Sequence, residues 1–247
     1  MVCLSACRLH RWKRGPLEAI SLFVQPKPSI SAAVEGLIAA KALRFSRIEL
    51  DAQDHLFREG DDVHATFYIT RGLIRLYSTS PDGYQKTVFF HKAKTLIGFQ
   101  AFQEKRGGNS SILNAQATTR CEGYAIDSQE FGDYLRSHGD VCYAVAQYFF
   151  EMMSLQTREA VNASTYPILQ RFAALLMTLA YEQAPAFIPF GNKELASMLG
   201  VHTNSITNSI SALRKAGCVE RRHGSLVVTD FKELKRFAEN LVLPKGN

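Results

Sequence analysis

The sequence predicts an α+β protein in which an N-terminal antiparallel β-roll, or jelly roll, is followed by one long helix and a C-terminal winged helix-turn-helix. Short β-rich runs separated by turn residues fill the stretch from about 45 to 126. Apolar residues then recur at helical spacing from position 141, and two short helices joined by a glycine turn occupy positions 192–217. We therefore expect an arm at 1–28, a β-roll at 29–138, a long helix at 139–165 and a winged domain at 166–247.

Composition narrows the class of protein. The chain has 247 residues, 46% of them apolar and 21% charged, as in ordinary soluble proteins. It has neither an apolar run long enough for a membrane helix nor an N-terminal secretion signal, which predicts a cytoplasmic protein without a membrane partner. The net charge of +6 collects at the two ends, with five basic residues against one acidic in 1–28 and ten against six from 166 onward. A basic C-terminal domain favours a polyanionic partner.

The first third of the chain passes from an irregular arm to a β-roll. Residues 1–28 contain three prolines and no sustained period, which indicates an arm without regular structure. A short helix is expected from Ser31 to Leu43. Turn residues such as those at 81–83 then separate eight predicted strands. These strands are 44–50, 54–57, 66–70, 73–80, 84–91, 95–99, 111–119 and 121–127.

Helical patterns begin after the last of these strands. Ser128 is the expected N-cap of a short helix that ends near Ser137. A heptad-like seam follows at Val141, Val145, Tyr148, Met152 and Leu155, and it would let two copies of the chain pair as a coiled coil. A long helix packed on its own β-roll would produce much the same pattern. The pair at 166–167, Tyr-Pro, should end this helix.

The C-terminal third carries the helix-turn-helix pattern. After a helix from Ile168 to Glu182, the first short helix places an apolar stripe toward the second, and Gly200 supplies the left-handed residue that ends it. Residues 219–222 and 225–230 flank His223-Gly224 as a two-stranded wing, and a last helix is expected from Phe231 to Asn240. The apolar stripes comprise Leu195, Ala196, Leu199, Ile206, Ile210 and Leu213.

The polar face of the second short helix predicts contact with DNA bases. Thr203, Asn204, Thr207 and Asn208, with Ser211, are short and uncharged and can reach base edges in a major groove. A merely solvated helix would carry more Glu and Lys. Side chains better placed for phosphate contacts are Ser205, Arg214, Lys215, Arg221, Arg222 and His223.

In this order, these segments resemble the Crp/Fnr superfamily of bacterial transcription regulators. The resemblance covers roughly residues 45 to 240 and rests on the glycine-marked strands of 56–90, on Leu96-Ile97-Gly98 and on 193–217 with the wing behind it. It implies a non-enzymatic, DNA-binding homodimer in which an effector bound near the β-roll and long helix reorients the DNA-binding domains. It also implies an inverted-repeat operator in double-stranded DNA, and RNA polymerase as a partner if the protein is an activator.

The resemblance also indicates which bases are read. Family members that read TGTGA or TTGAT half-sites carry a glutamate and an arginine on the second short helix, whereas this chain has Asn204 and Asn208 at the matching places. Asparagine suits adenine and a threonine methyl suits thymine, so we expect half-sites that lean toward A and T.

The position where family members hold a cyclic nucleotide is altered. They place a glutamate after the glycine for the ribose and an arginine before a serine for the cyclic phosphate. Here Gly98 precedes Phe99 and Gln100, and Asn109 stands at the position of the arginine. Without the guanidinium, the phosphate loses its main charge-assisted contact. We expect no binding of cyclic AMP or cyclic GMP.

A small organic or aromatic effector is expected instead. Aromatic and aliphatic residues around the Leu-Ile-Gly segment would form the walls of a pocket, with a few polar side chains to orient the ligand. This arrangement and Tyr166-Pro167-Ile168 at the hinge are similar to the branch of the family that senses halogenated phenols. The alternative is that these aromatics only fill the roll. The expected pocket residues are Phe89, Phe90, His91, Leu96, Ile97, Gly98, Phe99, Gln100, Tyr143 and Gln147.

A redox or iron–sulfur sensor on the same fold is the competing hypothesis, and it would use Cys3, Cys7 and Cys121. Because a four-iron cluster normally takes four thiolates, we expect no cofactor and no metal site. An all-β enzyme of the cupin type would need clustered histidines. His55 and His64 are not spaced for this with His91, so no catalytic residue is expected.

Overall fold

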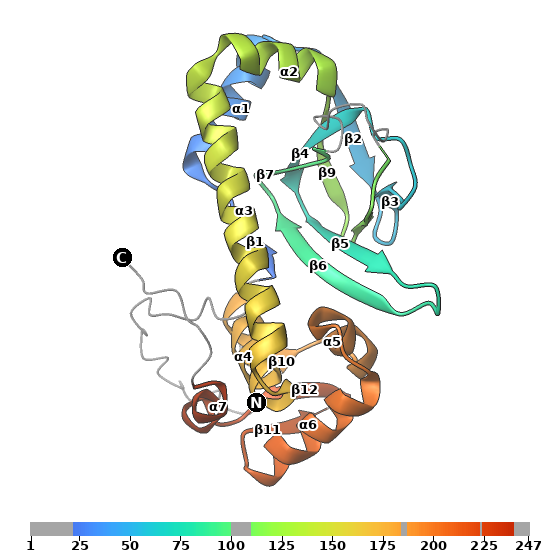
Figure 1. Ribbon diagram of the computed structural model, residues 1–247, viewed down its shortest axis with the longest axis vertical. Coiled ribbons are helices and arrows are strands. Elements are labelled where there is room, and N and C mark those ends of the chain that lie inside the picture. The colour runs from blue at the N-terminus through green and yellow to red at the C-terminus, as the bar shows by residue number, and fades with distance from the viewer. Residues whose placement is uncertain (1–21, 100–109, 184–186, 223, 240–247) are drawn as a thin grey trace, which may run out of the picture.

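The computed structural model describes residues 22–99, 110–183, 187–222 and 224–239. A β-roll lies beside one end of a long helix, α3 (Gly139–Thr165), and a smaller helical domain lies at the other end (Figure 1). The predicted α+β architecture is therefore confirmed.

All eight predicted strands of the β-roll are present. They are β2 (Phe45–Leu50), β3 (His55–Phe57), β4 (Ala65–Arg71), β5 (Leu73–Thr79), β6 (Gln85–Lys92), β7 (Thr95–Ile97), β8 (Asn114–Ala117) and β9 (Cys121–Asp127). One sheet has the order β2-β9-β4-β7, and the other contains β6-β5-β8-β3, with antiparallel pairing throughout these strands. Side chains from both sheets form one buried core, which includes Tyr68, Ile74, Leu96 and Ile126.

The end of the predicted arm is structured, contrary to the sequence prediction. Phe23–Val24 forms β1, which pairs in parallel with β6 and extends that sheet to five strands. Leu22, Phe23 and Val24 are all buried, and the Phe23 ring stacks on Phe90 with 5.1 Å between centroids. A two-residue strand is too short to show a period, so the pattern of the sequence did not reveal it. Residues 1–21 lie outside the described part of the chain.

Two helices flank the roll in the chain, one before β2 and one after β9, and both contact α3. Helix α1 (Pro28–Ala40) begins three residues before the predicted Ser31 because proline fits the first turn, and it ends at Lys41, which adopts a left-handed conformation. Helix α2 (Ser128–Ser137) is capped by the carboxylate of Asp127, which accepts a hydrogen bond from the backbone N–H of Glu130. The predicted cap, Ser128, is instead the first helical residue and is buried.

The seam that was predicted for dimerisation faces the protein's own roll. Val145 and Tyr148 are buried in the core of the roll, Met152 and Leu155 pack against that core, and Val141 is also buried. The assignment of these five residues to a dimer interface was therefore wrong. Coiled-coil pairing and packing on a β-roll both require one apolar stripe at helical spacing, so the period did not distinguish them. The helix ends at Tyr166, as predicted.

The C-terminal domain is a winged helix-turn-helix, as predicted. Helix α4 (Ile168–Gln183) leads to α5 (Asn192–Leu199) and α6 (Thr203–Lys215), and α7 (Phe231–Ala238) closes the domain. The wing strands β11 (Val219–Arg222) and β12 (Ser225–Val228) pair with each other and with a third strand that was not predicted, β10 (Phe187–Ile188). Gly200 ends α5 in the left-handed conformation at φ 64°. The predicted apolar stripes are buried between α5 and α6.

Candidate nucleic-acid interface and ligand pocket

Helix α6 presents the predicted polar face to solvent. Thr203, Asn204, Thr207, Asn208 and Ser211 are all exposed. On the opposite face, Ile206, Ile210 and Leu213 are buried against the rest of the domain. This packing fixes the direction of the polar side chains, and the helix lies at the outer edge of the domain (Figure 1). The geometry is that of a recognition helix that can enter a groove of DNA.

Asn192, at the start of α5, connects this face to the wing. Its amide nitrogen donates to the Thr207 hydroxyl at 3.1 Å, and its amide oxygen accepts from the Arg221 guanidinium. Arg221 also donates to the carbonyl oxygen of Gly224 at 3.1 Å. The wing arginine is thereby held at a fixed position beside α6. Asn192 was not among the predicted site residues because its partners lie 15 and 29 positions away along the chain.

The predicted phosphate-contact residues surround the same helix. Arg214 and Lys215 are exposed in its last turn, and Arg222 is exposed on the wing beside Glu220, with which it pairs. Ser205 is half-buried near the start of the helix. His223 lies outside the described residues. Positive groups in the last turn of α6 and on the wing suit two stretches of a phosphate backbone.

An apolar pocket of about 400 Å³ lies where the roll meets α3. His91, Leu96, Ile97, Gly98 and Phe99, all predicted pocket residues, contribute to its wall. The other lining residues were not predicted, because their strands and helix meet only in the folded chain: Phe57, Leu76, Ile112, Leu113, Phe149 and Met152.

His91 carries the one polar side chain among the described lining residues. Its ring is fully buried, and burial lowers its pKa from 6.5 to about 3. The Tyr148 hydroxyl donates to the carbonyl oxygen of Leu96 at 3.0 Å, and its oxygen lies 3.4 Å from Nδ1 of His91. Nδ1 therefore carries the proton and donates a hydrogen bond to the Tyr148 oxygen. Nε2 is then an acceptor, and it has no hydrogen-bond partner among the described residues. An acceptor left unpaired in this way costs roughly 1–3 kcal/mol.

Four of the predicted pocket residues lie elsewhere in the described structure. Phe89 belongs to the core of the roll, and Phe90 stacks on Phe23. Tyr143 and Gln147 are exposed on the outer side of α3 and line a different groove there. Phe90 was placed wrongly because neighbouring residues on a strand point to opposite faces, and Tyr143 and Gln147 because they lie on a different side of α3 from Phe149 and Met152. Gln100 and Asn109 lie outside the described residues.

Two sequence profiles match this chain. The profile of the cyclic nucleotide-binding domain matches residues 47–138, and that of the Crp-like helix-turn-helix domain matches residues 170–237. Together they cover well over half of the chain, in the order in which the structure shows the two domains. The chain belongs to the Crp/Fnr family. It is a DNA-binding transcription regulator of that type.

Known proteins similar to this Crp/Fnr regulator differ in what their names describe. The nitrogen fixation regulation protein FixK of Bradyrhizobium diazoefficiens is 21% identical over 84% of this chain and 90% of its own. The c-di-GMP responsive global regulator CLP of Xanthomonas campestris superposes with a TM-score of 0.71 at 16% identity, over 79% of this chain and 99% of its own. A structure of CprK complexed with OCPA superposes with a TM-score of 0.61 at 16% identity, over 82% of this chain and 93% of its own. At such identities, the structures establish the fold alone.

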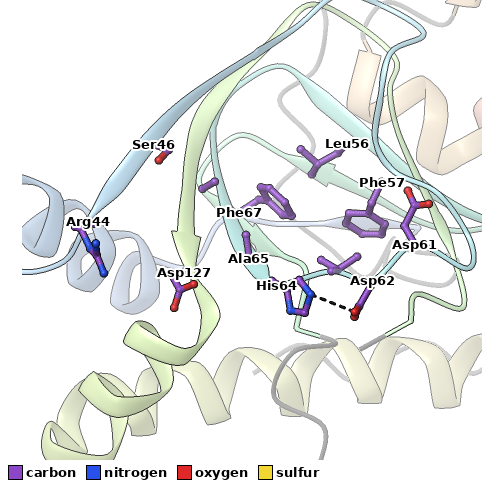
Figure 2. Close-up of a pocket in the computed structure, with 12 residues that line it drawn as sticks. Arg44, Ser46, Leu56, Phe57, Asp61, Asp62, His64, Ala65, Phe67 and Asp127 are labelled. Carbon is purple, nitrogen blue, oxygen red and sulfur yellow. Dashed lines mark ion pairs between the residues drawn. The ribbon is translucent and has the colours of Figure 1, made fainter. Parts of the chain in front are cut away.

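A larger hollow of about 850 Å³ lies against strands β2, β3, β4 and β9 of the roll (Figure 2). Its floor is apolar, and its rim carries Asp61, Asp62, His64 and Asp127. The Asp61 carboxylate accepts from the backbone N–H of Arg58, Asp62 pairs with His64, and Asp127 caps α2. Because these rim groups already serve the local structure of the Crp/Fnr roll, the smaller pocket beside α3 is the better candidate for a ligand.

The cysteines of this regulator do not form a described cluster. Cys121 is buried, burial raises its pKa, and its thiol donates to carbonyl oxygens of Leu73 and Thr119, which disfavours a thiolate. Cys3 and Cys7 lie outside the described residues. Within the described ranges, no three His, Cys, Asp or Glu side chains gather as a metal site requires.

The described helices also include none that is long and apolar enough to cross a membrane.

Proposed function

We propose that this regulator is an effector-responsive homodimer that binds an inverted repeat in cytoplasmic DNA and whose effector is a small organic molecule. The observation that carries the proposal is the apolar pocket between the roll and α3. It joins the two elements whose relative position determines where the DNA-binding domain lies. A ligand that fills it contributes contacts to both, and such differential contacts shift a conformational equilibrium.

The lining of the pocket defines the class of effector. A volume of about 400 Å³ accommodates a molecule built on a single aromatic ring. The described lining residues include no cation that would pair with a phosphate and no carboxylate that would hold a ribose. Nε2 of His91 can accept a hydrogen bond that no described residue donates, so a phenol or an alcohol in its neutral form fits better than an anion.

A second face of α3 supports the dimer. Tyr143, Phe150 and Met153 are 66%, 67% and 63% exposed, and they continue to Val161 along the side of the helix that points away from the roll. Tyr143, Phe150 and Met153 recur at steps of seven and three, which is heptad spacing, and Val161 follows eight residues later on the same side of the helix. Large apolar side chains exposed in one row are typical of a surface that another chain covers. We infer that a second copy of α3 packs on this row.

The base-reading role of α6 is tested by selecting bound sequences from random DNA and then comparing two variants. Asn208→Ala removes an exposed amide that suits adenine, so discrimination at one base pair should fall by roughly 1–3 kcal/mol. Arg221→Ala should weaken all sequences alike and reduce the salt dependence of binding. Equal losses on selected and random duplexes for both variants would contradict the assignment of Asn208.

The ligand site is tested by a melting-temperature screen with phenols, benzyl alcohols and benzoates. A ligand that binds only the folded state raises the transition. Met152→Trp fills the pocket from α3 and should abolish the shift, whereas Gln147→Trp places the same side chain on the exposed side of α3 and should leave it intact. A shift that survives Met152→Trp would place the ligand elsewhere. Binding of cyclic AMP with a comparable shift would contradict the proposed effector class.

A further inference from the structure

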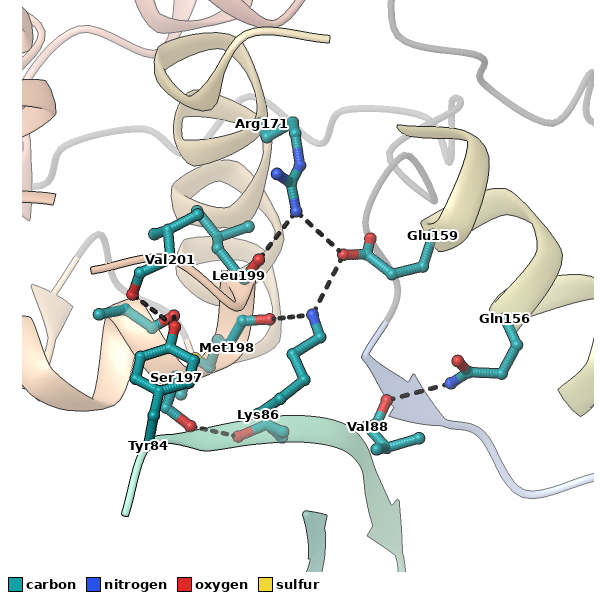
Figure 3. A network of polar contacts seen from close by, with 12 residues as sticks. Tyr84, Lys86, Val88, Gln156, Glu159, Arg171, Ser197, Met198, Leu199 and Val201 are labelled. Carbon is teal, nitrogen blue, oxygen red and sulfur yellow. Dashed lines mark hydrogen bonds and ion pairs between the residues drawn. The ribbon is translucent and has the colours of Figure 1, made fainter. Parts of the chain in front are cut away.

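The β-roll and the DNA-binding domain are joined by a polar contact between β6 and the C-terminal end of α5 (Figure 3). Lys86 on β6 donates from Nζ to the carbonyl oxygen of Met198 at 3.1 Å. Arg171 on α4 donates from Nη2 to the carbonyl oxygen of Leu199 at 2.8 Å. The final carbonyls of a helix lack partners within the helix and carry partial negative charge, so two cations at this end are favourable.

Glu159 on α3 lies between these two cations. Its Oε1 atom is 3.4 Å from Nζ of Lys86 and 3.4 Å from Nη2 of Arg171. The three side chains are 14%, 32% and 6% exposed, so water screens their charges weakly. Two cations held this close in a buried place repel each other, and a single carboxylate offsets that repulsion. Figure 3 shows the carboxylate reaching from α3 toward both of them.

Further contacts hold α5 against the hairpin formed by β5 and β6. The Tyr84 hydroxyl donates to the carbonyl oxygen of Val201, and the hydroxyls of Thr87 and Ser197 lie 3.0 Å apart. Arg75 on β5 donates to Ser197 at 2.7 Å. Any Cβ at Gly200 would come within 2.8 Å of the Lys86 side chain, so the two surfaces are in close contact.

We propose that Glu159 is a positioning residue that holds the DNA-binding domain on the β-roll by neutralising Lys86 and Arg171. Its placement on α3, seven residues after Met152 of the pocket wall, makes this contact sensitive to the position of that helix. The contact also lies on strands that line the pocket, because Leu76 follows Arg75 and His91 is on β6 with Lys86. Rotation or sliding of α3 would withdraw the carboxylate and release α5. As an account of regulation, this inference rests on the proposed function.

Docking can be measured without DNA or effector by trapping a disulfide. Thr87→Cys with Ser197→Cys places two thiols where the native hydroxyls are 3.0 Å apart, which suits a disulfide, and the corresponding single-cysteine variants control for the native cysteines. Adding Glu159→Gln leaves the buried Arg171 and the half-buried Lys86 without their carboxylate and should reduce the trapping rate under mild oxidation by about tenfold or more. Glu151→Gln, on the same helix but paired with Lys27 at the surface, should leave the rate unchanged.

Charge, rather than packing, is tested by a third background. Lys86→Met with Glu159→Gln removes one cation together with the carboxylate and should restore trapping to within about threefold of the parent. Equal trapping rates in the Glu159→Gln and Glu151→Gln backgrounds would overturn the proposal. It would also be overturned if Glu159→Gln lowered the trapping rate equally with and without Lys86→Met. Failure of the parent pair to cross-link would show that the docked arrangement is not populated and would overturn it as well.

The regulatory consequence has its own measurement. The disulfide-locked and reduced forms are compared for affinity to a duplex that the protein itself selects from random DNA. Locking should change the dissociation constant by at least about fivefold, because it removes the freedom to reorient α6. An unchanged constant would overturn the regulatory role. Failure of the selection would instead contradict the proposed function and leave the trapping result standing.

Discussion

Acidification should destabilise this protein through His91, which is the fully buried histidine of the pocket wall. Burial lowers its pKa in the folded state to about 3, whereas the same side chain in the unfolded chain has a pKa of 6.5. The unfolded chain therefore takes up the proton first as the pH falls. The stability that the neutral ring contributes is complete above pH ~6.5 and is lost progressively as the pH decreases toward ~3.

The size of this effect follows from the difference between the two pKa values. Each pH unit below ~6.5 should reduce the free energy of unfolding by about 1.4 kcal/mol, so the loss through His91 at a pH of about 5 is about 2 kcal/mol. Other titrating groups change stability over the same range, so the comparison is made with His91→Gln. That variant retains a side-chain N–H for the Tyr148 hydroxyl but does not titrate.

Urea unfolding followed by circular dichroism at about pH 7.5 and about pH 5 measures the difference. We expect the parent to lose about 2 kcal/mol more than His91→Gln between the two conditions. An effector that donates a hydrogen bond to Nε2 should leave the size of this loss unchanged, because the ring of the folded protein is neutral at both pH values. Equal losses in parent and variant would show that His91 is not held neutral by burial, and the inference about a neutral phenol or alcohol would then fail.

Two further substitutions test the dimer face and the roll. Phe150→Glu places a charge in the exposed apolar row of α3 and should weaken self-association by roughly 2–4 kcal/mol, measured by sedimentation. Ala52→Glu, exposed in the turn between β2 and β3, should not, and a Phe150→Glu variant that stays dimeric would contradict the row as the interface. Gly123→Ala would bring a Cβ within 2.3 Å of a backbone carbonyl oxygen of β4 and should lower the melting temperature by several degrees or more. Gly139→Ala adds a Cβ that meets nothing within 4 Å and should be tolerated. Similar melting temperatures for the two variants would refute the close approach of β9 and β4.

Local signals allowed much of the fold to be predicted from the sequence. Turn residues and β-branched runs located the eight strands of the roll, and Gly200 and Pro167 marked the ends of helices. The exposed face of α6 was also predicted, because helical spacing separates Asn204 and Asn208 from the buried Ile206. These features depend on residues within one or two turns of each other.

Features that depend on distant contacts were missed or placed wrongly. Two apolar stripes run along α3, one through Tyr148 and the other through Phe150, and the spacing does not show which of them meets the roll. Likewise, the sequence does not show that Glu159 meets Lys86, 73 residues earlier in the chain. The pocket illustrates both cases, since His91 was predicted from its neighbours on β6 but Ile112 was not.

The short strand β1 determines how the protein can be trimmed or fused. Leu22 and Phe23 pack with Phe90 in the core of the DNA-binding domain, whereas Val24 belongs to the core of the roll. A recombinant protein that starts at α1 would lack Leu22, Phe23 and Val24 and would expose apolar surface where the β-roll meets the DNA-binding domain. Conversely, a reporter protein fused directly before residue 22 would lie where the β-roll meets the DNA-binding domain. Its bulk would hinder movement of the DNA-binding domain relative to the roll.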